Sequence, residues 1–531
     1  MYRSLFFLFI LLPLQALIAQ PAIEWAKCYG GTSFDGARSI VATSDGGYIL
    51  VGETFSTDGD VSGLHVNTDP NSGNADYWVV KIDNLGKIQW QKCLGSYGDD
   101  QGELIIQTKD GGYAIAGYTY PDSANDGDIH GAHFFEGIWF VKIDSMGKTQ
   151  WQRALGGYET KASAIVQATD GGFVISGYTT SKNGDIVGLH YTDSTQESDC
   201  WIVKLDTIGN IQWQQTLGGY ESDEANSIIN TFDGGYIVAA STNSNDGDVT
   251  DSHGSEDAWI IKLNDSGKVQ WKKTYGGSAS DNALKIFQQF DSGCIFFGYT
   301  SSMDGDVKSN PDSGGYWMVK INKHGEIQSE KVLGNSKKFP YYSIINVSDG
   351  GYVFAGTVSQ RKSDFSIIKL NEMGDLVWQK TMGGSGVDYG YSVAESKDGG
   401  YIMAGETSSI DGDVTGIHDS VRQLADAWVV KLFSDKNNVA NHRDLEQQNI
   451  SIFPNPNNGI GKIKYTLNKS SQVQIEIYDA IGRLTQILAN DFENLGDHEY
   501  NFDVSTFSSG QYFIHLESEG ISIVKGFEIV K

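Results

Sequence analysis

The chain has 531 residues, of which 64 are Gly, 12 are Trp and 4 are Cys, and 67 Asp and Glu residues outnumber 39 Lys and Arg residues. The formal net charge of -28 argues against nucleic acid as a partner, because phosphate binding needs a basic surface. The apolar and aromatic content is too high for an intrinsically disordered chain. Abundant Gly, Trp and Tyr instead predict an all-β fold with many tight turns.

The N-terminus carries one basic residue, Arg3, followed by an apolar run and by small residues ending at Ala19. This pattern predicts a secretory signal peptide over residues 1–20. The run is too short to span a bilayer comfortably, and no later stretch is apolar enough, so we expect no transmembrane segment.

The four cysteines are too few for a disulfide framework in an exported chain of this length. Cys28 and Cys93 occupy equivalent places in successive repeats, which usually lie too far apart to bridge. We therefore expect Cys28, Cys93, Cys200 and Cys294 to be buried or half-buried thiols without a catalytic role.

Three short sequence patterns recur along the chain up to residue 433. The pattern Asp-Gly-Gly-aromatic first occurs at Asp45, and with one degenerate copy at Asp291 it appears seven times, about 50 to 65 residues apart. A Trp-x-Val-Lys pattern first occurs at Trp78, and an Ile-Gln-Trp pattern follows it at Trp90. The last two patterns contain all 12 Trp residues of the chain, so the tryptophans are a property of the repeat.

Each repeat reads as four strands, exemplified by residues 39–43, 48–54, 78–83 and 87–90. A lone fourth strand over residues 23–27 precedes the first repeat, and the seventh repeat lacks its fourth strand. Residues 21–433 are therefore predicted to form a seven-bladed β-propeller, closed by the N-terminal strand together with the three C-terminal strands. Closure also hides strand edges that would invite aggregation. The paired tryptophans resemble the tryptophan-docking hairpins of quinoprotein-like propellers, but no haem-attachment motif accompanies them, so no dehydrogenase activity is expected.

The long loops between the second and third strands share the pattern [Asp/Asn]-Gly-Asp, and in five of the seven repeats a His follows. The carboxylates of these loops are Asp58, Asp60, Asp126, Asp128, Asp185, Asp246, Asp248, Asp304, Asp306, Asp411 and Asp413. The histidines are His65, His133, His190, His253 and His418. The loops between repeats add Asp35, Asp100, Asp223, Asp281 and Asp388. One face of the propeller is therefore expected to be strongly acidic, with Tyr97, Tyr158 and Tyr220 among the carboxylates.

Two interpretations of these loops stay open. In the first, each loop binds a divalent cation, most plausibly Ca²⁺, through carboxylate and carbonyl oxygens, although the match to an EF-hand is poor and His suits Zn²⁺ better. In the second, the Asp residues form hydrogen-bonded turns and the His bonds across its own loop, as repetition in most blades favours. No other cofactor is indicated.

The sequence carries no catalytic signature. It has no nucleophile elbow, zinc-protease helix or phosphate-binding loop, and no unique carboxylate pair stands out as a glycosidase acid and base. The tryptophans lie in strands, where core packing explains them better than sugar stacking.

The last eighty residues change pattern, with no Trp and no Asp-Gly-Gly. Residues 434–449 read as a polar linker, and short alternating strands over residues 450–531 predict a small β-sandwich. The module resembles the C-terminal sorting domain of the type IX (Por) secretion system of Bacteroidota-like bacteria. The residues that carry the resemblance are Pro454, Asn455, Pro456, Gly482, Arg483, Gly510, Tyr512, Lys525 and Lys531.

That resemblance implies export through both membranes of a Gram-negative cell, followed by release or by attachment to the outer surface. We expect the type IX secretion machinery as a partner, a glycan or protein as a possible ligand, and a monomeric protein. The favoured function is a secreted or cell-surface binding or adhesion scaffold rather than an enzyme. The alternative is a polysaccharide-active hydrolase or lyase that uses the central cleft of the propeller.

Overall fold

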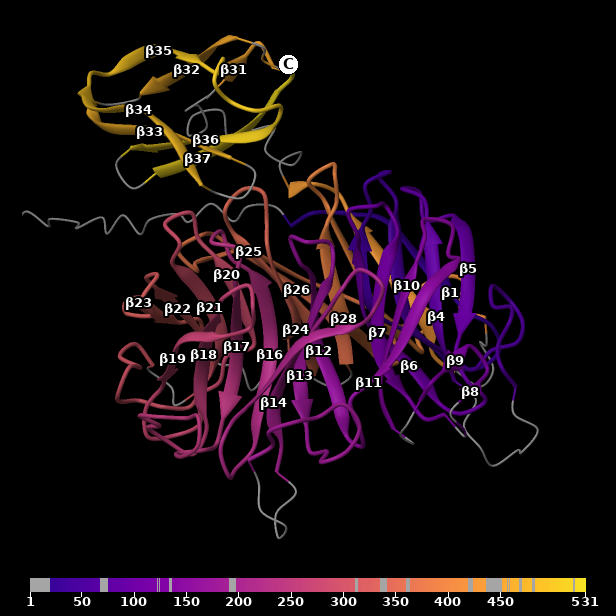
Figure 1. Ribbon diagram of the computed structural model, residues 1–531. Coiled ribbons are helices and arrows are strands. Elements are labelled where there is room, and N and C mark those ends of the chain that lie inside the picture. Colours follow the sequence, from indigo (N-terminus) through magenta and orange to yellow (C-terminus); the bar gives the residue numbers. More distant parts are fainter. Residues whose placement is uncertain are drawn as a thin grey trace, which may run out of the picture. The chain divides into compact units, whose positions relative to one another are not determined.

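The computed structural model describes residues 20–66, 75–121, 123, 125–132, 136–190, 197–310, 314–334, 341–359, 363–418, 424–435, 451–455, 457, 459–467, 470–479, 483–518 and 521–531. These residues form β-strands joined by turns and loops, with no helix long and apolar enough to cross a membrane among them. Contacts divide the chain into two units, with strands β1 to β30 in the larger and β31 to β37 in the smaller (Figure 1).

The strands of the larger unit form seven four-stranded antiparallel sheets within the described residues (Figure 1). The first sheet contains β2 (Asp35–Ala42), β3 (Tyr48–Thr54), β4 (Asp76–Ile82) and β5 (Ile88–Leu94). The second contains β6 (Asp100–Gln107), β7 (Tyr113–Thr119), β10 (Gly137–Ile143) and β11 (Thr149–Leu155). The third contains β12 (Thr160–Gln167), β13 (Phe173–Thr179), β14 (Asp199–Leu205) and β15 (Ile211–Leu217). The fourth contains β16 (Asp223–Asn230), β17 (Tyr236–Thr242), β18 (Asp257–Leu263) and β19 (Val269–Tyr275).

The remaining sheets continue the pattern. The fifth contains β20 (Lys285–Gln288), β21 (Cys294–Thr300), β22 (Gly315–Ile321) and β23 (Ile327–Val332). The sixth contains β24 (Tyr341–Asn346), β25 (Tyr352–Ser359), β26 (Ser363–Leu370) and β27 (Leu376–Met382). The seventh contains β28 (Asp388–Glu395), β29 (Tyr401–Thr407), β30 (Asp426–Leu432) and, as its fourth strand, β1 (Ile23–Tyr29). A short hairpin of β8 (Asn125–Asp126) and β9 (Ile129–His130) lies in a loop of the second sheet.

The first strand of the chain completes the last sheet, as the repeat order predicts. Strand β1 pairs antiparallel with β30, bringing Cys28 opposite Trp428. Each hydrophobic core cluster of the larger unit draws on two consecutive sheets, and one cluster joins Leu50 and Trp78 of the first sheet to Ala404 and Val429 of the seventh.

The middle strands are largely apolar because both of their faces are covered. All residues of β3, β4 and β10 are buried, whereas the fourth strands β5 and β11 are only half-buried. Gly117 in the second strand of its sheet must be glycine, because a Cβ there would lie 1.9 Å from the carbonyl oxygen of Gln101. The neighbouring strand bulges at this point, which brings the two backbones together.

The tryptophans of the two repeated patterns make different contacts. The third-strand Trp139 is buried, and its indole N–H donates to Gln152 at 2.8 Å. The fourth-strand Trp90 packs against Gly147 in a turn of the next sheet, where a Cβ would lie 3.0 Å from the ring. Gly147 also has φ +80, so two constraints favour glycine there. Equivalent contacts pair Trp25 with Gly86, Trp151 with Gly209, Trp213 with Gly267 and Trp271 with Gly325.

A buried lysine holds the Asp of the repeated Asp-Gly-Gly turn. Lys142 Nζ lies 2.9 Å from Asp110 Oδ2, 3.0 Å from the carbonyl of Ile143 and 2.9 Å from Gln150. Burial raises the pKa of Asp110, but hydrogen bonds from Thr108 and Lys142 outweigh this and lower it to about 2. The same ion pair joins Lys81 to Asp45, Lys204 to Asp170, Lys369 to Asp349 and Lys431 to Asp398. The aspartate of this turn, expected only to shape the turn, is therefore also the counter-ion of a buried lysine.

The smaller unit contains two antiparallel sheets around one hydrophobic core. One sheet contains β31 (Ser451–Phe453), β32 (Ile460–Leu467) and β35 (Gly496–Asp503). The other contains β33 (Ser471–Asp479), β34 (Leu484–Glu493), β36 (Gly510–Ser518) and β37 (Ile521–Ile529).

We predict that removing the acidic partner of one buried lysine destabilises the larger unit. Asp110→Asn leaves Lys142 without its counter-ion, and because Asp110 is half-exposed we expect a loss of about 1–2 kcal/mol in the free energy of unfolding. Adding Lys142→Met to that variant removes the stranded charge and should restore most of the stability. Denaturant unfolding of the full chain measures both changes, and losses that simply add in the double variant would contradict the ion-pair account.

Candidate functional site

The carboxylates of the [Asp/Asn]-Gly-Asp loops accept hydrogen bonds from backbone amides. Asp58 Oδ1 accepts the amide N–H of Thr32, in the loop between sheets, at 2.7 Å. Equivalent bonds run from Tyr97 to Asp126, Tyr220 to Asp246, Ser278 to Asp304 and Ser385 to Asp411, at 2.6–3.3 Å.

The second aspartate of each pattern is bonded to a glycine of the same inter-sheet loop. The amide of Asp60 donates to the carbonyl of Gly30 at 2.8 Å, and its carboxylate accepts the Gly30 N–H at 3.4 Å. The backbone bond recurs at Asp128, Asp185, Asp248, Asp306 and Asp413.

This geometry supports the hydrogen-bonded-turn interpretation of the loops, in which Asp oxygens replace missing backbone partners. Among the residues that the structure describes, no set of three or more His, Cys, Asp or Glu side chains is arranged to hold a metal ion. Calcium binding at these loops stays a prediction.

The loop histidines bind the aspartate that begins the third strand of their own sheet. The backbone N–H and Nδ1 of His65 lie 3.0 and 2.8 Å from Asp76 Oδ2. His190 repeats this contact with Asp199, and His418 repeats it with Asp426. His133 lies outside the described residues.

The other ring nitrogen of these histidines faces the next sheet. Nε2 of His65 lies 4.0 Å from Asp128, and Nε2 of His190 lies 3.4 Å from Asp248. His418 of the seventh sheet lies 3.7 Å from Asp60 of the first. The hydrogen bond with Asp76 raises the pKa of His65, against the opposing effect of burial. The histidines are thus placed to link neighbouring sheets electrostatically.

The ring of His253 departs from this arrangement, although its backbone N–H still donates to Asp257 Oδ2 at 2.6 Å. Its Nδ1 lies 3.8 Å from Asp257 Oδ1, and its ring, together with Lys272 and Asp306, lines a pocket of about 330 Å³. Lys272 is already paired with Asp248 at 2.6 Å.

The aspartates between repeats are buried, contrary to the expectation that they add to an acidic surface. Asp100 is fully buried, and it accepts bonds from the Thr119 hydroxyl and from the amide and hydroxyl of Ser96. Burial raises its pKa to about 7 despite these bonds. Asp35, Asp223, Asp281 and Asp388 are equally buried. These aspartates join the start of the first strand to the end of the second strand of their sheet. Their role is therefore structural.

A cluster of charged and aromatic side chains lies on the first and second strands of the seventh, first and second sheets. We call Arg38, Glu53, Glu103, Tyr391 and Glu406 the first-strand cluster. Arg38 lies 2.6 Å from Glu53, and its guanidinium lies 4.4 Å from the centre of the Tyr391 ring. The Tyr391 hydroxyl donates to Glu406 at 3.1 Å. Strand β2 packs beside both β6 and β28, which is why three sheets contribute.

The electrostatics of this cluster are unusual. Burial raises the pKa values of Glu103 and Glu406, while the nearby charge of Arg38 opposes the rise. Oε2 of Glu406 and Nε of Arg38 are buried without a hydrogen-bond partner in the structure. The cluster therefore keeps donor and acceptor capacity that the fold itself does not use.

Sequence reasoning missed this cluster, although a signal was present. The fourth residue of the first strand is Arg38, Glu103, Asn226 or Tyr391 in four different sheets, whereas the first residue is Asp and the third is Gly or Ala in all four. The sixth residue of the second strand varies likewise, as Glu53, Tyr118, Ser241 or Glu406. Variation inside an otherwise regular repeat marks positions that the fold does not dictate.

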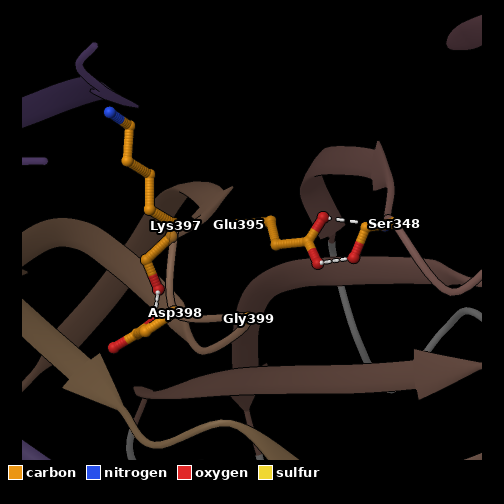
Figure 2. Close-up of a pocket in the computed structure, with 6 residues that line it drawn as sticks. Ser348, Glu395, Lys397, Asp398 and Gly399 are labelled. Carbon is orange, nitrogen blue, oxygen red and sulfur yellow. Dashed lines mark hydrogen bonds between the residues drawn. The ribbon is translucent and has the colours of Figure 1, made fainter. Parts of the chain in front are cut away.

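A second pocket, of about 430 Å³, lies among the turns between first and second strands (Figure 2). Glu395 there accepts the amide N–H of Ser348 at 2.8 Å and the Ser348 hydroxyl at 2.5 Å. Lys397 donates to the carbonyl of Ser44 in the first sheet. These contacts join the sixth sheet to the seventh and the seventh to the first, and we assign them to sheet packing.

The sorting-motif residues lie in the smaller unit. Asn455, next to Pro454, accepts the amide of Glu528 at 2.9 Å, and Arg483 Nε lies 2.8 Å from Asp479. Gly510 begins β36, Tyr512 is buried in that strand, and Lys525 lies in β37. Lys531 Nζ donates to the carbonyl of Ser505 at 2.8 Å. Pro456 and Gly482 lie outside the described residues.

Two of the sequence expectations about thiols and aromatic rings agree with the structure. All four cysteines are buried and none forms a disulfide, and burial raises the pKa of Cys93 to about 12, so these thiols are poorly suited to nucleophilic chemistry. Tyr97, Tyr158 and Tyr220 are exposed.

We predict that the free energy of unfolding falls as the pH rises from about 4 to 8. Burial raises the pKa of Asp35 and Asp223 to about 6 and that of Asp100 to about 7, whereas unfolded chains ionise such carboxyls near pH 4. The folded protein therefore binds more protons than the unfolded chain in this interval. The stabilisation is complete below about pH 4 and is lost as the pH passes through 6 and 7. Thermal and denaturant unfolding across this pH range measures the slope.

The variant Asp100→Asn should make this slope shallower, because one of the three groups no longer titrates. Asp110→Asn is the matched control, since the pKa of Asp110 is about 2 and this carboxyl ionises below the interval. An unchanged slope in Asp100→Asn would contradict the prediction.

Comparison with curated proteins gives one partial match. Residues of this chain are 24% identical over 229 positions to the regulatory protein FlaEY of Caulobacter vibrioides. The match covers 40% of this chain and 22% of FlaEY, so the chain spans about a fifth of that relative.

Comparison with solved structures gives matches of low sequence identity and low TM-score. A puromycin hydrolase mutant complexed with PGG matches with a TM-score of 0.43 and 10% identity, over 81% of this chain and 58% of the hydrolase. The β-propeller domain of the Trilobed protease from Pyrococcus furiosus matches with a TM-score of 0.39 and 10% identity, over 77% of this chain and 99% of that domain. These scores are too low to carry any functional argument.

The smaller unit has a specific match. Residues 451–530 match the family described as the secretion system C-terminal sorting domain, and they include all seven strands of the smaller unit. The family implies interaction with the secretion machinery and a secreted or cell-surface protein. The C-terminal module of this chain is therefore a sorting domain of the type IX secretion system.

Proposed function

We propose that this protein is a secreted or surface-attached binding protein whose larger unit is a closed seven-bladed β-propeller. Closure is supported by the pairing of β1 with β30 and by the core cluster that joins the first and seventh sheets. The contacts of His418 with Asp60 and of Lys397 with Ser44 bridge the same pair of sheets. A closed ring places the first strands around its axis, with the first-strand cluster among them.

The proposed route of export uses both ends of the chain. Residues 1–20 act as signal peptide, residues 21–433 form the propeller, residues 434–449 link it to the sorting domain of residues 450–531, and the protein functions as a monomer. Delivery ends outside the outer membrane of a Gram-negative cell.

The observation that carries the binding function is the variable composition of the first-strand cluster. The repeated positions hold structural pairs, such as Lys142 with Asp110, whereas the variable positions hold Arg38, Glu103 and Glu406. Side chains with unused hydrogen-bonding capacity, gathered on three neighbouring sheets, are suited to hold a polar ligand.

A hydrolase or lyase is the second candidate, and one observation favours it. Glu103 and Glu406 have pKa values raised by burial, and a raised pKa is what a carboxyl needs to act as a general acid. In that case Arg38 would orient the substrate and a second carboxylate would act as base or nucleophile.

We predict that Glu406→Gln lowers the affinity for the ligand about tenfold or more, because it replaces one acceptor oxygen of the cluster with an amide donor and removes the negative charge. The full chain is first screened against immobilised glycans and proteins, and wild type and variant are then compared by calorimetry. Glu326→Gln, in an exposed turn of the fifth sheet, is the matched control and should bind as wild type does. If the wild type converts a bound glycan to products and Glu406→Gln does not, the result would favour the enzyme. Capture of no ligand at all would contradict both the binding function and the enzyme.

We predict that truncation after residue 448 leaves the larger unit folded but blocks its delivery to the cell surface. The sorting domain has its own core and its own two sheets, so its removal exposes no core cluster of the larger unit. Cell fractionation and surface proteolysis measure the location, and the melting temperature of the purified truncation checks folding. Normal surface delivery of the truncated protein would refute the assignment.

A further inference from the structure

Three tyrosines occupy the same position in consecutive inter-sheet loops. Tyr97, Tyr158 and Tyr220 precede the second, third and fourth sheets and are 47%, 56% and 55% exposed. The same position holds Thr32, Ser278 and Ser385 elsewhere, so the repeat does not require an aromatic residue there. Large exposed rings on neighbouring sheets, in a protein whose tryptophans are buried or half-buried, indicate a contact surface.

Hydrogen bonds hold the backbone of the loops that carry these rings. The amides of Tyr97 and Tyr220 donate to Asp126 and Asp246 of the [Asp/Asn]-Gly-Asp loops. Glu159, the neighbour of Tyr158, accepts the hydroxyl of Thr180 at 3.0 Å. Because the backbone that carries the rings is already ordered, less conformational entropy is lost when a ligand docks on them.

A fourth tyrosine connects these rings to the strands. Tyr120 is 40% exposed, and burial, a hydrogen bond with Glu136 and the proximity of Tyr158 raise its pKa to about 12. Its ring lies 5.8 Å from that of Tyr118, which stands beneath the ammonium group of Lys161. We call Tyr97, Tyr120, Tyr158 and Tyr220 the tyrosine rim.

Carboxylates lie around the tyrosine rim and determine which class of ligand it can bind. Asp99, Glu159 and Glu221 lie one or two residues from its members, and Glu136 bonds Tyr120. Ionised carboxylates accept hydrogen bonds but donate none, so the ligand must be rich in donors. The same charges repel polyanions.

From these observations we propose that the tyrosine rim binds a polysaccharide free of carboxylate and sulfate groups. Sugar rings would stack on the faces of Tyr158 and Tyr220, as amphipathic aromatic side chains permit, and sugar hydroxyls would donate to the neighbouring carboxylates. The inference rests on the proposed binding function and names the class of its ligand.

The proposal is tested by affinity electrophoresis of the full chain. The gels contain a soluble neutral β-glucan, partly deacetylated chitin oligosaccharides or alginate, and a poly-lysine peptide serves as a competitor. We expect retardation by the β-glucan and the chitin oligosaccharides, and none by alginate. Tyr158→Ala and Tyr220→Ala should each weaken binding roughly tenfold, whereas Tyr158→Phe should stay within about twofold because stacking needs only the ring. Ser278→Ala, at the equivalent position of the fifth sheet, is the matched control.

Retardation by alginate as strong as by the β-glucan, or unchanged binding in both alanine variants, would overturn the proposal. So would tighter binding of poly-lysine than of either glycan, or the absence of any glycan binding when a protein ligand is captured. If Glu406→Gln weakens binding while the tyrosine variants do not, the rim assignment fails and the binding function stands. Melting temperatures close to that of wild type confirm that the variants are folded.

Discussion

The contact between a fourth-strand tryptophan and the turn glycine of the next sheet determines how the sheets stack. A four-stranded sheet with apolar residues on both faces needs a neighbour on each side. Trp90 meets Gly147 in this way, and Trp25, carried by the first strand of the chain, meets Gly86. Because β1 belongs to the seventh sheet, the Trp25 contact joins the last sheet to the first. In the fifth sheet Ser329 replaces the tryptophan, and the corresponding Gly374 meets Leu333 and Met318 instead. An aliphatic surface therefore substitutes for the ring at one interface.

Sheets stacked by apolar contacts still have to accommodate the polar groups at their ends. Asp35 and Asp100, at the starts of their strands, meet this need by accepting bonds from hydroxyl and amide donors in the adjoining loops. His65 and His418 solve it between sheets, because each stands between a buried aspartate of its own sheet and a carboxylate of the next. Buried polar groups that are mutually satisfied cost little, whereas an orphaned one would cost several kcal/mol, on the order of a large part of a domain's stability. The repeated acidic residues are in this sense part of the packing.

The repeating elements and the sorting domain could be predicted from the sequence, because their signals lie close together along the chain. Turn glycines, alternating strands and the tryptophan pairs each leave a signal within one repeat, and the motif around Pro454 and Tyr512 lies within one module. The burial of Asp35 was not predicted, because its position in an inter-sheet loop suggested exposure. A signal did exist, since a threonine such as Thr54 recurs at the end of the second strand, opposite that aspartate. The first-strand cluster was missed for a different reason. Arg38 and Tyr391 come from the two ends of the larger unit and meet only after the first and seventh sheets pack together.

In this molecule the repeated positions serve the fold, and the variable positions are the ones proposed to bind a ligand. Many positions that the repeat fixes are occupied by groups that bond to each other, such as Lys142 with Asp110, although Oδ1 of Asp76 and of Asp426 is also buried without a hydrogen-bond partner. The two sets of side chains proposed to bind a ligand come from a few sheets: the first-strand cluster draws on the seventh, first and second sheets, and the tyrosine rim on the second, third and fourth. The second sheet contributes Glu103 to one and Tyr120 to the other, and Tyr118 in β7 packs against Tyr120 from the strand side. A ligand long enough to contact both would therefore cross the second sheet. Since both sets combine carboxylates with aromatic rings, one donor-rich chain is chemically compatible with the whole path.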